Sequence, residues 1–177
     1  VPLAEGSLAA KVNILDDLRF QLHTSGGNPA LCRRAEYLLD SLDEHGYLPK
    51  TALSDLSSAF HLSRSESFAA LCQLQSLEPA GIGARSLQEC LYLQLKRNSP
   101  DDQIALAIVK NHMNSLAKAD YTCISAALNV SMDAVMQAAF QIRLLQPYPL
   151  GSEIGETHYV YPELIVFLHD GELAVSP

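Results

Sequence analysis

The sequence has no apolar run that approaches the roughly 18 residues needed by a membrane-spanning helix, which excludes an integral membrane protein. It has no basic and apolar leader at Val1, so nothing in it marks secretion. Because it starts without Met and stops at Pro177 soon after an extended-looking stretch, we expect it to be a piece of a longer protein.

Basic residues are few in this chain. There are 12 Lys and Arg against 20 Asp and Glu, and the formal net charge is −8. The only adjacent basic pairs are Arg33-Arg34 and Lys96-Arg97, whereas nucleic-acid binders usually gather basic residues on one face. The acidic balance therefore favours binding to a basic protein surface over wrapping DNA.

The residue patterns of catalytic and metal sites are also missing. The histidines form no His-Glu-x-x-His arrangement, and no Gly-rich segment follows a predicted strand. Paired acids fall at helix surfaces and ends, where solvated or capping roles explain them. We therefore predict no catalytic, cofactor-binding or metal site. An enzyme or a ligand-binding bundle, which would need a pocket lined by clustered polar groups, is the weaker alternative.

The cysteines form no Cys-x-x-Cys pair, and each lies within an apolar helical pattern. This predicts buried, reduced thiols in a cytoplasmic protein. The residues concerned are Cys32, Cys72, Cys90 and Cys123.

Helical periodicity runs to about residue 146 and predicts an all-α fold. After a first apolar stripe over residues 8–22, Asn28-Pro29 reads as the cap and first residue of a helix that ends near Leu42. Gly46 can then take the left-handed conformation that follows a helix end. A helix over residues 52–60 comes next. Capping boxes at Ser63 and Ser86 predict further helices, and Ser99-Pro100 predicts another.

An internal repeat aligns residues 56–79 with residues 124–147, at a constant offset and without gaps. Identical pairs include Ser57/Ser125, Ser63/Ser131, Ala70/Ala138 and Leu77/Leu145. Each copy reads as a short helix, a tight turn and a longer helix, which is the helix-turn-helix layout. Two interpretations follow, either DNA readers or helical hairpins that pack cores and bind proteins.

Charge separates these two interpretations. The long helix of the second copy carries Asp133 and Arg143 as its only charges, and it lacks the cluster of side chains needed to read base edges. In the first copy, Glu66 offsets Arg64. We therefore favour protein binding, and keep a DNA-binding module acting through residues 124–147 as the alternative.

The segment of residues 77–86 has the composition of a rigid corner between two antiparallel helices. Pro79 ends one helix, and Gly81 and Gly83 permit a tight reversal around Ile82. Arg85 precedes the next helix, where it can bind a helix C-terminus, a carboxylate or a phosphate. The same corner can present Arg85 to a partner.

The stretch from Leu42 to Leu48, followed by the run Glu-Pro-Ala-Gly-Ile-Gly-Ala-Arg-Ser-Leu-Gln-Glu-Cys-Leu over residues 78–91, resembles the core-binding region of the sigma-54 family of RNA polymerase sigma factors. Residues 159–166 are similar to the extended segment that follows in that family. Two departures concern the tail: Leu150 interrupts the family's Pro-x-Pro-Gly pattern, and Leu173 stands where tryptophan is frequent.

The resemblance implies a sigma subunit that binds core RNA polymerase and awaits an ATP-hydrolysing activator. It also implies that the activator-responding N-terminal region and the promoter-reading C-terminal helix-turn-helix lie outside this chain. We therefore expect a fragment that keeps polymerase docking and depends on the full-length protein for promoter DNA and activator response.

We predict two helical-bundle subdomains with helix-turn-helix-like repeats, over residues 1–97 and 99–147, and an extended or β-hairpin tail over residues 148–177. The residues that we expect to contact polymerase lie at two corners: Asp43, Glu44 and Tyr47 at one, Glu78 and Arg85 at the other. The residues that we expect to shape these corners are Gly46, Pro79, Gly81, Ile82 and Gly83.

Overall fold

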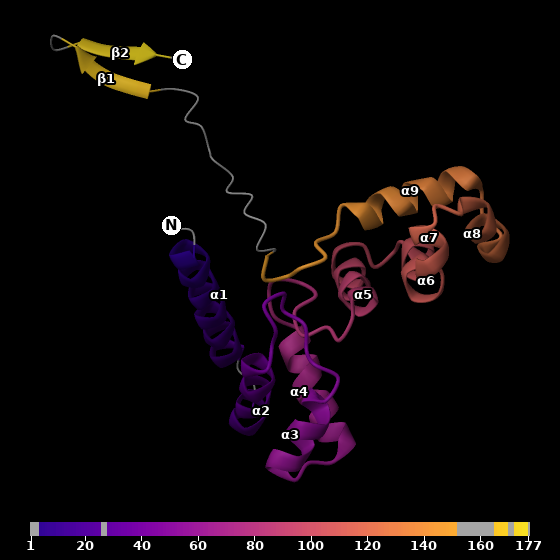
Figure 1. Ribbon diagram of the computed structural model, residues 1–177, viewed down its shortest axis with the longest axis horizontal. Coiled ribbons are helices and arrows are strands. Elements are labelled where there is room, and N and C mark those ends of the chain that lie inside the picture. The colour runs from indigo at the N-terminus through magenta and orange to yellow at the C-terminus, as the bar shows by residue number, and fades with distance from the viewer. Residues whose placement is uncertain (1–3, 26–27, 152–164, 170–171, 177) are drawn as a thin grey trace.

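The computed structural model describes residues 4–25, 28–151, 165–169 and 172–176. Helices account for most of these residues, so the predicted helical class is confirmed (Figure 1). The helices are α1 (Ala4–Thr24), α2 (Pro29–Asp40), α3 (Ala52–Phe60), α4 (Arg64–Gln75), α5 (Leu87–Asn98), α6 (Gln103–Asn111), α7 (Met113–Ala117), α8 (Tyr121–Leu128) and α9 (Met132–Arg143).

Side-chain caps set where several helices begin. Asn28 accepts a hydrogen bond from the amide of Ala30 at the start of α2, with proline as the first helical residue. Ser63 and Glu66 form the complete capping box predicted for α4. Both starts are therefore confirmed, because the cap satisfies amides that a helix leaves unpaired at its first turn.

Two predicted helix starts differ from the structure. Ser86 accepts from the amide of Glu89, but the Glu89 carboxylate does not return to Ser86 and binds Arg85 instead, so the second capping box is half formed. The cap of α6 is Asp102, whose Oδ1 accepts from the amide of Ala105, and not the predicted Ser99. Ser99 instead ends α5, where its amide donates to Leu95.

The turn of the internal repeat has the same conformation in both copies, α3–α4 and α8–α9. His61 and Asn129 occupy equivalent positions in the turns, and both adopt left-handed conformations, with φ of 51° and 53°. The amides of Leu62 and Val130 donate to the carbonyls of Ser57 and Ser125, respectively, which are again equivalent residues. The predicted helix-turn-helix layout is therefore present twice.

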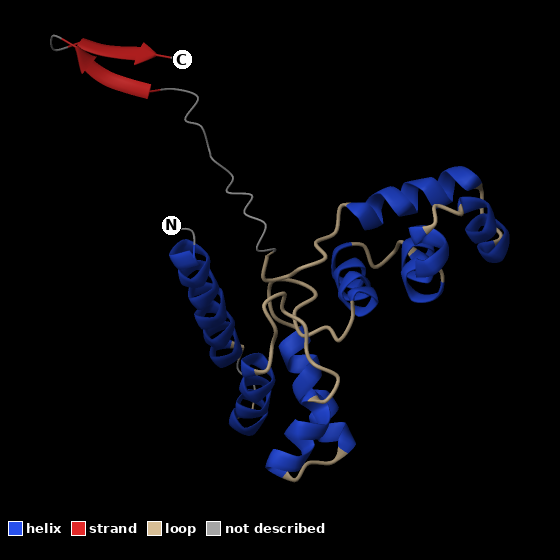
Figure 2. Cartoon of the chain, viewed as in Figure 1, coloured by secondary structure: helices blue, strands red, loops and turns tan. Residues whose placement is uncertain are grey.

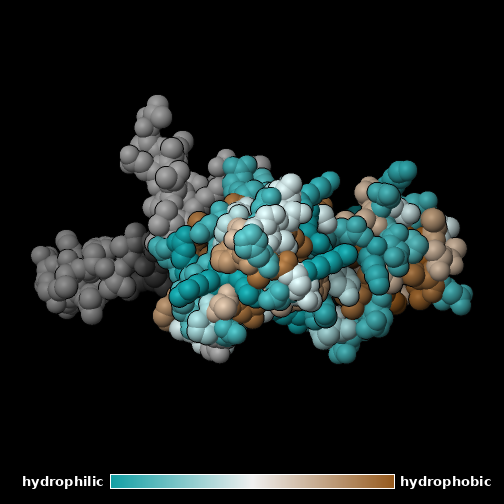
Figure 3. Space-filling model, turned by 90° about the horizontal axis from the view of Figure 1, so that it is seen from below, coloured by the Kyte–Doolittle hydropathy of each residue, from teal (hydrophilic) through white to brown (hydrophobic). Residues whose placement is uncertain are grey.

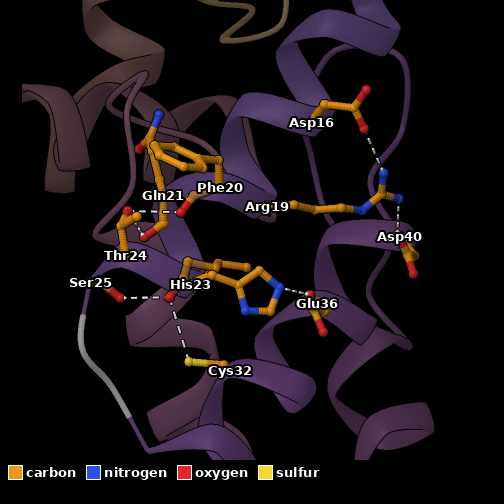
Figure 4. A network of polar contacts seen from close by, with 11 residues as sticks. Asp16, Arg19, Phe20, Gln21, His23, Thr24, Ser25, Cys32, Glu36 and Asp40 are labelled. Carbon is orange, nitrogen blue, oxygen red and sulfur yellow. Dashed lines mark hydrogen bonds and ion pairs between the residues drawn. The ribbon is translucent and has the colours of Figure 1, made fainter.

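One cluster of buried side chains joins α1, α2, α3, α4 and the corner at Ile82, with Leu18, Leu38 and Leu71 among its fully buried members. Polar contacts at the surface tie α1 to α2 (Figure 4). Arg19 bonds the carboxylates of Asp16 and Asp40, and these ion pairs raise its pKa. Such exposed pairs contribute little stability, so the leucine cluster holds this part together.

A second cluster joins α5, α6, α8 and α9, and Leu95, Ile108 and Ile124 are almost fully buried in it. The predicted subdomain boundary between residues 97 and 99 remains a prediction. The buried side chains, however, form two clusters that separate at another point of the chain. Leu91 and Leu95 belong to the second cluster and α5 packs against α6, so the two clusters separate at the corner of residues 77–86.

The cysteines only partly follow the predicted burial. Cys32 and Cys90 are buried, whereas Cys72 and Cys123 are exposed because they lie on the solvent-facing sides of α4 and α8. Within the described part of the chain, all four are free thiols.

Two antiparallel strands, β1 (Ile165–His169) and β2 (Glu172–Ser176), follow the helices, and Ile165 pairs with Ser176. Residues 152–164 and 170–171 lie outside the described residues, so the tail over residues 148–177 as a whole remains a prediction.

Among the described residues, no single helix is long and apolar enough to cross a bilayer. Only α8 and α9 taken together meet that criterion there, and they are bent by 113° where they meet.

The two repeats offer a matched test of capping. Ser63→Ala should lower the free energy of unfolding by about 1 kcal/mol. Ser131→Ala should cost less, because Ala134 stands where Glu66 stands in the first copy and cannot return a second capping bond. Urea denaturation of both variants measures the difference, and equal losses would contradict the assignment.

Candidate functional site

Three loops meet where the helices converge: residues 41–51 between α2 and α3, residues 76–86 between α4 and α5, and residues 144–151 after α9 (Figure 2). We call this region the three-loop junction. Backbone hydrogen bonds join the loops directly. Leu48 donates to the carbonyl of Ala84 at 2.8 Å, Gly83 donates to Gly46 at 3.0 Å, and Leu150 donates to His45 at 3.3 Å. The two corners predicted from the sequence are thus parts of one site.

Glycine is required where the loops pass one another. Gly46 and Gly81 have φ of 89° and 96°, a region that side chains with a Cβ rarely adopt. A Cβ on Gly81 would lie 2.7 Å from the sulfur of Cys90, and one on Gly46 would lie 2.9 Å from Cδ1 of Ile82. Ile82 is fully buried between the loops. The glycines therefore permit both the turns and their close approach.

The first predicted corner uses Asp43 as an internal acceptor. Its Oδ1 accepts hydrogen bonds from the amides of His45 at 2.9 Å and Tyr47 at 2.8 Å, which closes the turn. The Glu44 carboxylate lies 3.7 Å from Nε2 of His45, and 55% of the Glu44 side chain is exposed. Asp43 therefore shapes the loop, whereas Glu44 is available to a partner.

Tyr47 points into the junction. Its hydroxyl donates to the carbonyl of Pro147, and burial raises the pKa of Tyr47, with a smaller contribution from the neighbouring Cys90. Burial likewise raises the pKa of the Cys90 thiol. Tyr47 therefore stays protonated at neutral pH and acts as a hydrogen-bond donor that connects the first loop to the third.

The second predicted corner contains an ion pair within the chain. The guanidinium of Arg85 binds both carboxylate oxygens of Glu89, at 2.9 and 3.0 Å, and Gln75 donates to the same carboxylate at 3.1 Å. Burial alone would raise the pKa of Glu89, but the hydrogen bonds from Arg85 and Gln75 outweigh it and lower the pKa. Three ligands were predicted for Arg85: a helix C-terminus, a carboxylate or a phosphate. In the structure Arg85 binds a carboxylate, that of Glu89.

A different arginine binds the helix C-terminus. Arg97 of α5 donates to the carbonyls of Ser76 and Leu77, each at 2.8 Å, and pairs with the Glu78 carboxylate at 2.8 Å. The Glu78 side chain is nevertheless 68% exposed. In the sequence, Arg97 stands out only as one of two adjacent basic residues, because no local pattern links α5 to the end of α4.

Two glutamines complete the junction, and neither was predicted. The buried Gln94 donates to the carbonyl of Gln146 at 2.6 Å and accepts from its amide at 2.9 Å. Gln21 of α1 makes the same paired contact with the backbone of Glu78, at 3.0 and 2.8 Å. A side-chain amide can bond to a backbone N–H and a backbone C=O at the same time. This property could identify the two glutamines as junction residues only once their backbone partners are known to lie nearby.

The outer surface of the junction thus presents the carboxylates of Glu44 and Glu78 and the guanidinium of Arg85, on a backbone held by internal hydrogen bonds. In the described ranges, no group of three or more His, Cys, Asp or Glu side chains is placed to hold a metal ion. Rigidly presented charges of this kind suit recognition of another surface.

Residues 4–177 match the family described as the sigma-54 factor, core binding domain. The chain is 35% identical to the RNA polymerase sigma-54 factor of Acidithiobacillus ferridurans over 160 residues, covering 87% of this chain and 33% of that protein. It is 34% identical to the RNA polymerase sigma-54 factor of Bacillus subtilis, covering 79% of this chain and 32% of that protein. The chain spans about a third of the length of these curated relatives.

The role of close packing at the junction can be separated from that of backbone strain. Gly81→Ala should lower the free energy of unfolding by about 2–5 kcal/mol, since it adds a steric clash to an unfavourable φ. Gly151→Ala is the control, because its φ is 91° and a Cβ there meets nothing within 4 Å. It should cost only about 1–2 kcal/mol. Similar losses in denaturant titrations would argue against close packing at Gly81.

The Arg85–Glu89 pair predicts a pH-dependent contribution to stability. Glu89→Gln should cost about 1 kcal/mol at neutral pH, a modest value because Arg85 is partly exposed. The folded protein lowers the pKa of Glu89, so the contribution is present above the unfolded value of about 4.3 and is lost as the pH falls through the folded value. Unfolding free energies of the two proteins should converge in acid; a constant difference would exclude the ion pair as its cause.

Proposed function

The chain belongs to the family of sigma-54 factor core-binding domains, and from this premise we propose that it is the module by which a sigma factor docks on core RNA polymerase. The match across residues 4–177 is the observation that carries the proposal. Docking requires no bond to be made or broken by the chain, so we assign its side chains roles in position and charge and none in catalysis.

The outer surface of the three-loop junction is the proposed contact. Glu44, Glu78 and Arg85 carry exposed charges there, with side-chain exposures of 55%, 68% and 43%. Asp43 and Tyr47 are assigned the supporting role of holding the loop that presents Glu44, since their polar groups bond within the chain. A basic polymerase surface would complement the two carboxylates and the net charge of −8.

A broad polar surface accompanies these charges. The face of the molecule seen in Figure 3 is mostly hydrophilic, and its hydrophobic residues form separate patches. We propose that two helical units, one on each side of the junction, hold this surface against the polymerase. Their division at residues 77–86 would follow the two buried clusters.

Promoter recognition and response to an ATP-dependent activator are proposed for the full-length protein and not for this chain alone. The curated relatives are about three times longer than the part that matches, which leaves room for such regions. We propose a cytoplasmic location because core polymerase is the partner.

The alternative of a DNA-binding module in residues 124–147 has less support. The solvent-facing side of α9 carries apolar residues, with Gln137 and Gln141 as exposed amides and Arg143 as its one basic residue. Phosphate contacts by Lys and Arg supply most of the affinity of nonspecific DNA binding. A promoter duplex therefore belongs in the same experiment as polymerase.

The test measures the rate and affinity with which this 177-residue chain binds core RNA polymerase, by surface plasmon resonance at several salt concentrations. The wild-type chain should bind polymerase and show little affinity for the duplex. The double variant Glu44→Gln plus Glu78→Gln should associate about threefold or more slowly at low salt, because rim charges act mainly on the on-rate. That difference should shrink toward about 1 M salt.

Asp55→Asn is the matched control, because it neutralises an exposed acid on α3 outside the junction and should leave the on-rate unchanged. Failure of the wild-type chain to bind polymerase would refute the proposed function. Salt-sensitive binding to the duplex alone would establish the DNA-binding alternative.

A further inference from the structure

An uncovered row of apolar side chains runs along α9. Met132, Met136, Phe140 and Leu144 recur at every fourth position, a spacing that places them on one side of the helix. They are 38%, 45%, 60% and 62% exposed, and they make up four of the nine exposed large hydrophobic side chains among the described residues. We call these four residues the α9 stripe. Contiguous exposed apolar surface of this kind marks interaction sites.

The fold itself does not require the α9 stripe. The opposite side of α9 supplies the buried cluster through Val135, Ala138 and Ile142. The first repeat allows a comparison, since α4 has the same length as α9 and also begins at a serine N-cap. The residues of α4 equivalent to the stripe are Arg64, Phe68, Cys72 and Ser76. A helix in this position thus folds with arginine and serine at the two ends of the row.

A groove with an acidic wall lies beside the α9 stripe. Met136 and Phe140 line one side of it, and Asp101, Asp102 and Ile104 at the start of α6 line the other. Asp102 is engaged as the cap of α6, whereas Asp101 is exposed at the rim. The groove therefore has apolar side chains along its α9 side and negative charge along the opposite edge.

We propose that the α9 stripe and this groove receive an apolar segment of core RNA polymerase that carries Lys or Arg along one flank. The inference rests on the proposed function and adds a second contact, which begins at Leu144 beside the junction and runs along α9. Apolar side chains of such a segment would cover Met136 and Phe140, as in helix-in-groove recognition, and its basic residues would face Asp101. Methionine adapts its shape to a partner, and buried aromatic anchors supply much of the affinity.

The proposal commits to a protein partner with this chemistry because of the acidic wall. Negative charge at the groove repels DNA phosphates, and a second copy of a chain with a net charge of −8 would bring like charges together. A basic and apolar polymerase surface complements both the apolar α9 side and the acidic wall.

The experiment compares the affinity of core polymerase for the wild-type 177-residue chain and for the double variant Met136→Gln plus Phe140→Gln. Glutamine keeps helix propensity and removes the apolar surface. We expect the dissociation constant to rise at least about tenfold. Phe20→Gln is the matched control, because Phe20 is 65% exposed on α1. Its neighbours on the helix surface are polar or charged: Asp16, Asp17, His23 and Thr24. This substitution should leave the affinity for polymerase within about twofold of the wild-type value.

Each outcome supports or overturns the proposed contact at the α9 stripe. If the wild-type chain does not bind polymerase, the proposed function fails and this inference fails with it. If the wild-type chain binds and the double variant binds equally well, the α9 stripe is not a contact although docking stands. An equal loss for Phe20→Gln would also overturn the assignment, because the effect would then be unspecific.

Two further measurements address a second copy of the chain as the occupant of the α9 stripe and a double variant that fails to fold. Sedimentation that shows a wild-type dimer, lost in the double variant while polymerase affinity is kept, would assign the α9 stripe to a second copy and overturn the proposal. If the double variant does not fold, Leu144→Ser replaces it, because the equivalent position in α4 is Ser76. That substitution should weaken binding by about threefold or more, and an unchanged affinity would refute the contact.

Discussion

The close passage of three loops is the constraint on which the rest of the structure depends. Their backbones hydrogen-bond directly, and they approach so closely only because Gly46, Gly81 and Gly83 have no Cβ at positive φ. Every helix from α1 to α5 reaches this point through a loop or a side chain, and the loop after α9 returns to it. The position of the helices relative to one another, and of the charges on the outer surface, follows from it.

Backbone groups inside the junction are satisfied by side chains from distant helices. Gln94 pairs with Gln146, Gln21 with Glu78, and Arg97 with the last carbonyls of α4. A buried backbone group left without a partner costs about 1–3 kcal/mol, so these contacts decide which arrangement of loops is stable. The backbone of the junction is thus held by these amide and guanidinium contacts, and the side chains of Glu44 and Glu78 remain 55% and 68% exposed.

The two helix-turn-helix copies separate folding from function. Their buried positions match, as in Leu56 with Ile124 and Leu74 with Ile142, because a helix must bury one apolar side to pack. Their exposed sides differ, with Arg64 and Ser76 in α4 where Met132 and Leu144 stand in α9. The layout shared with DNA readers therefore says little about a partner, whereas the chemistry of the solvent-facing side favours a protein surface.

Features that depend on residues close together in the chain could be predicted from the sequence. The caps at Asn28 and Ser63, the helix over residues 52–60, the repeat and the family follow from residues that act within about one helical turn or from motifs read in order. The sequence also contained the spacing of the α9 stripe. It did not distinguish that side from the buried side at Val135 and Ile142, because both are apolar.

Only the tertiary structure decided that the two predicted corners form one junction, that Arg97 and not Arg85 binds the end of α4, and that α5 packs with the second cluster. The reason is distance along the chain. Gln94 and Gln146 are 52 residues apart, and Tyr47 and Pro147 are 100 apart. Which donor meets which acceptor over such separations depends on how the helices pack, and no local pattern of residues encodes it.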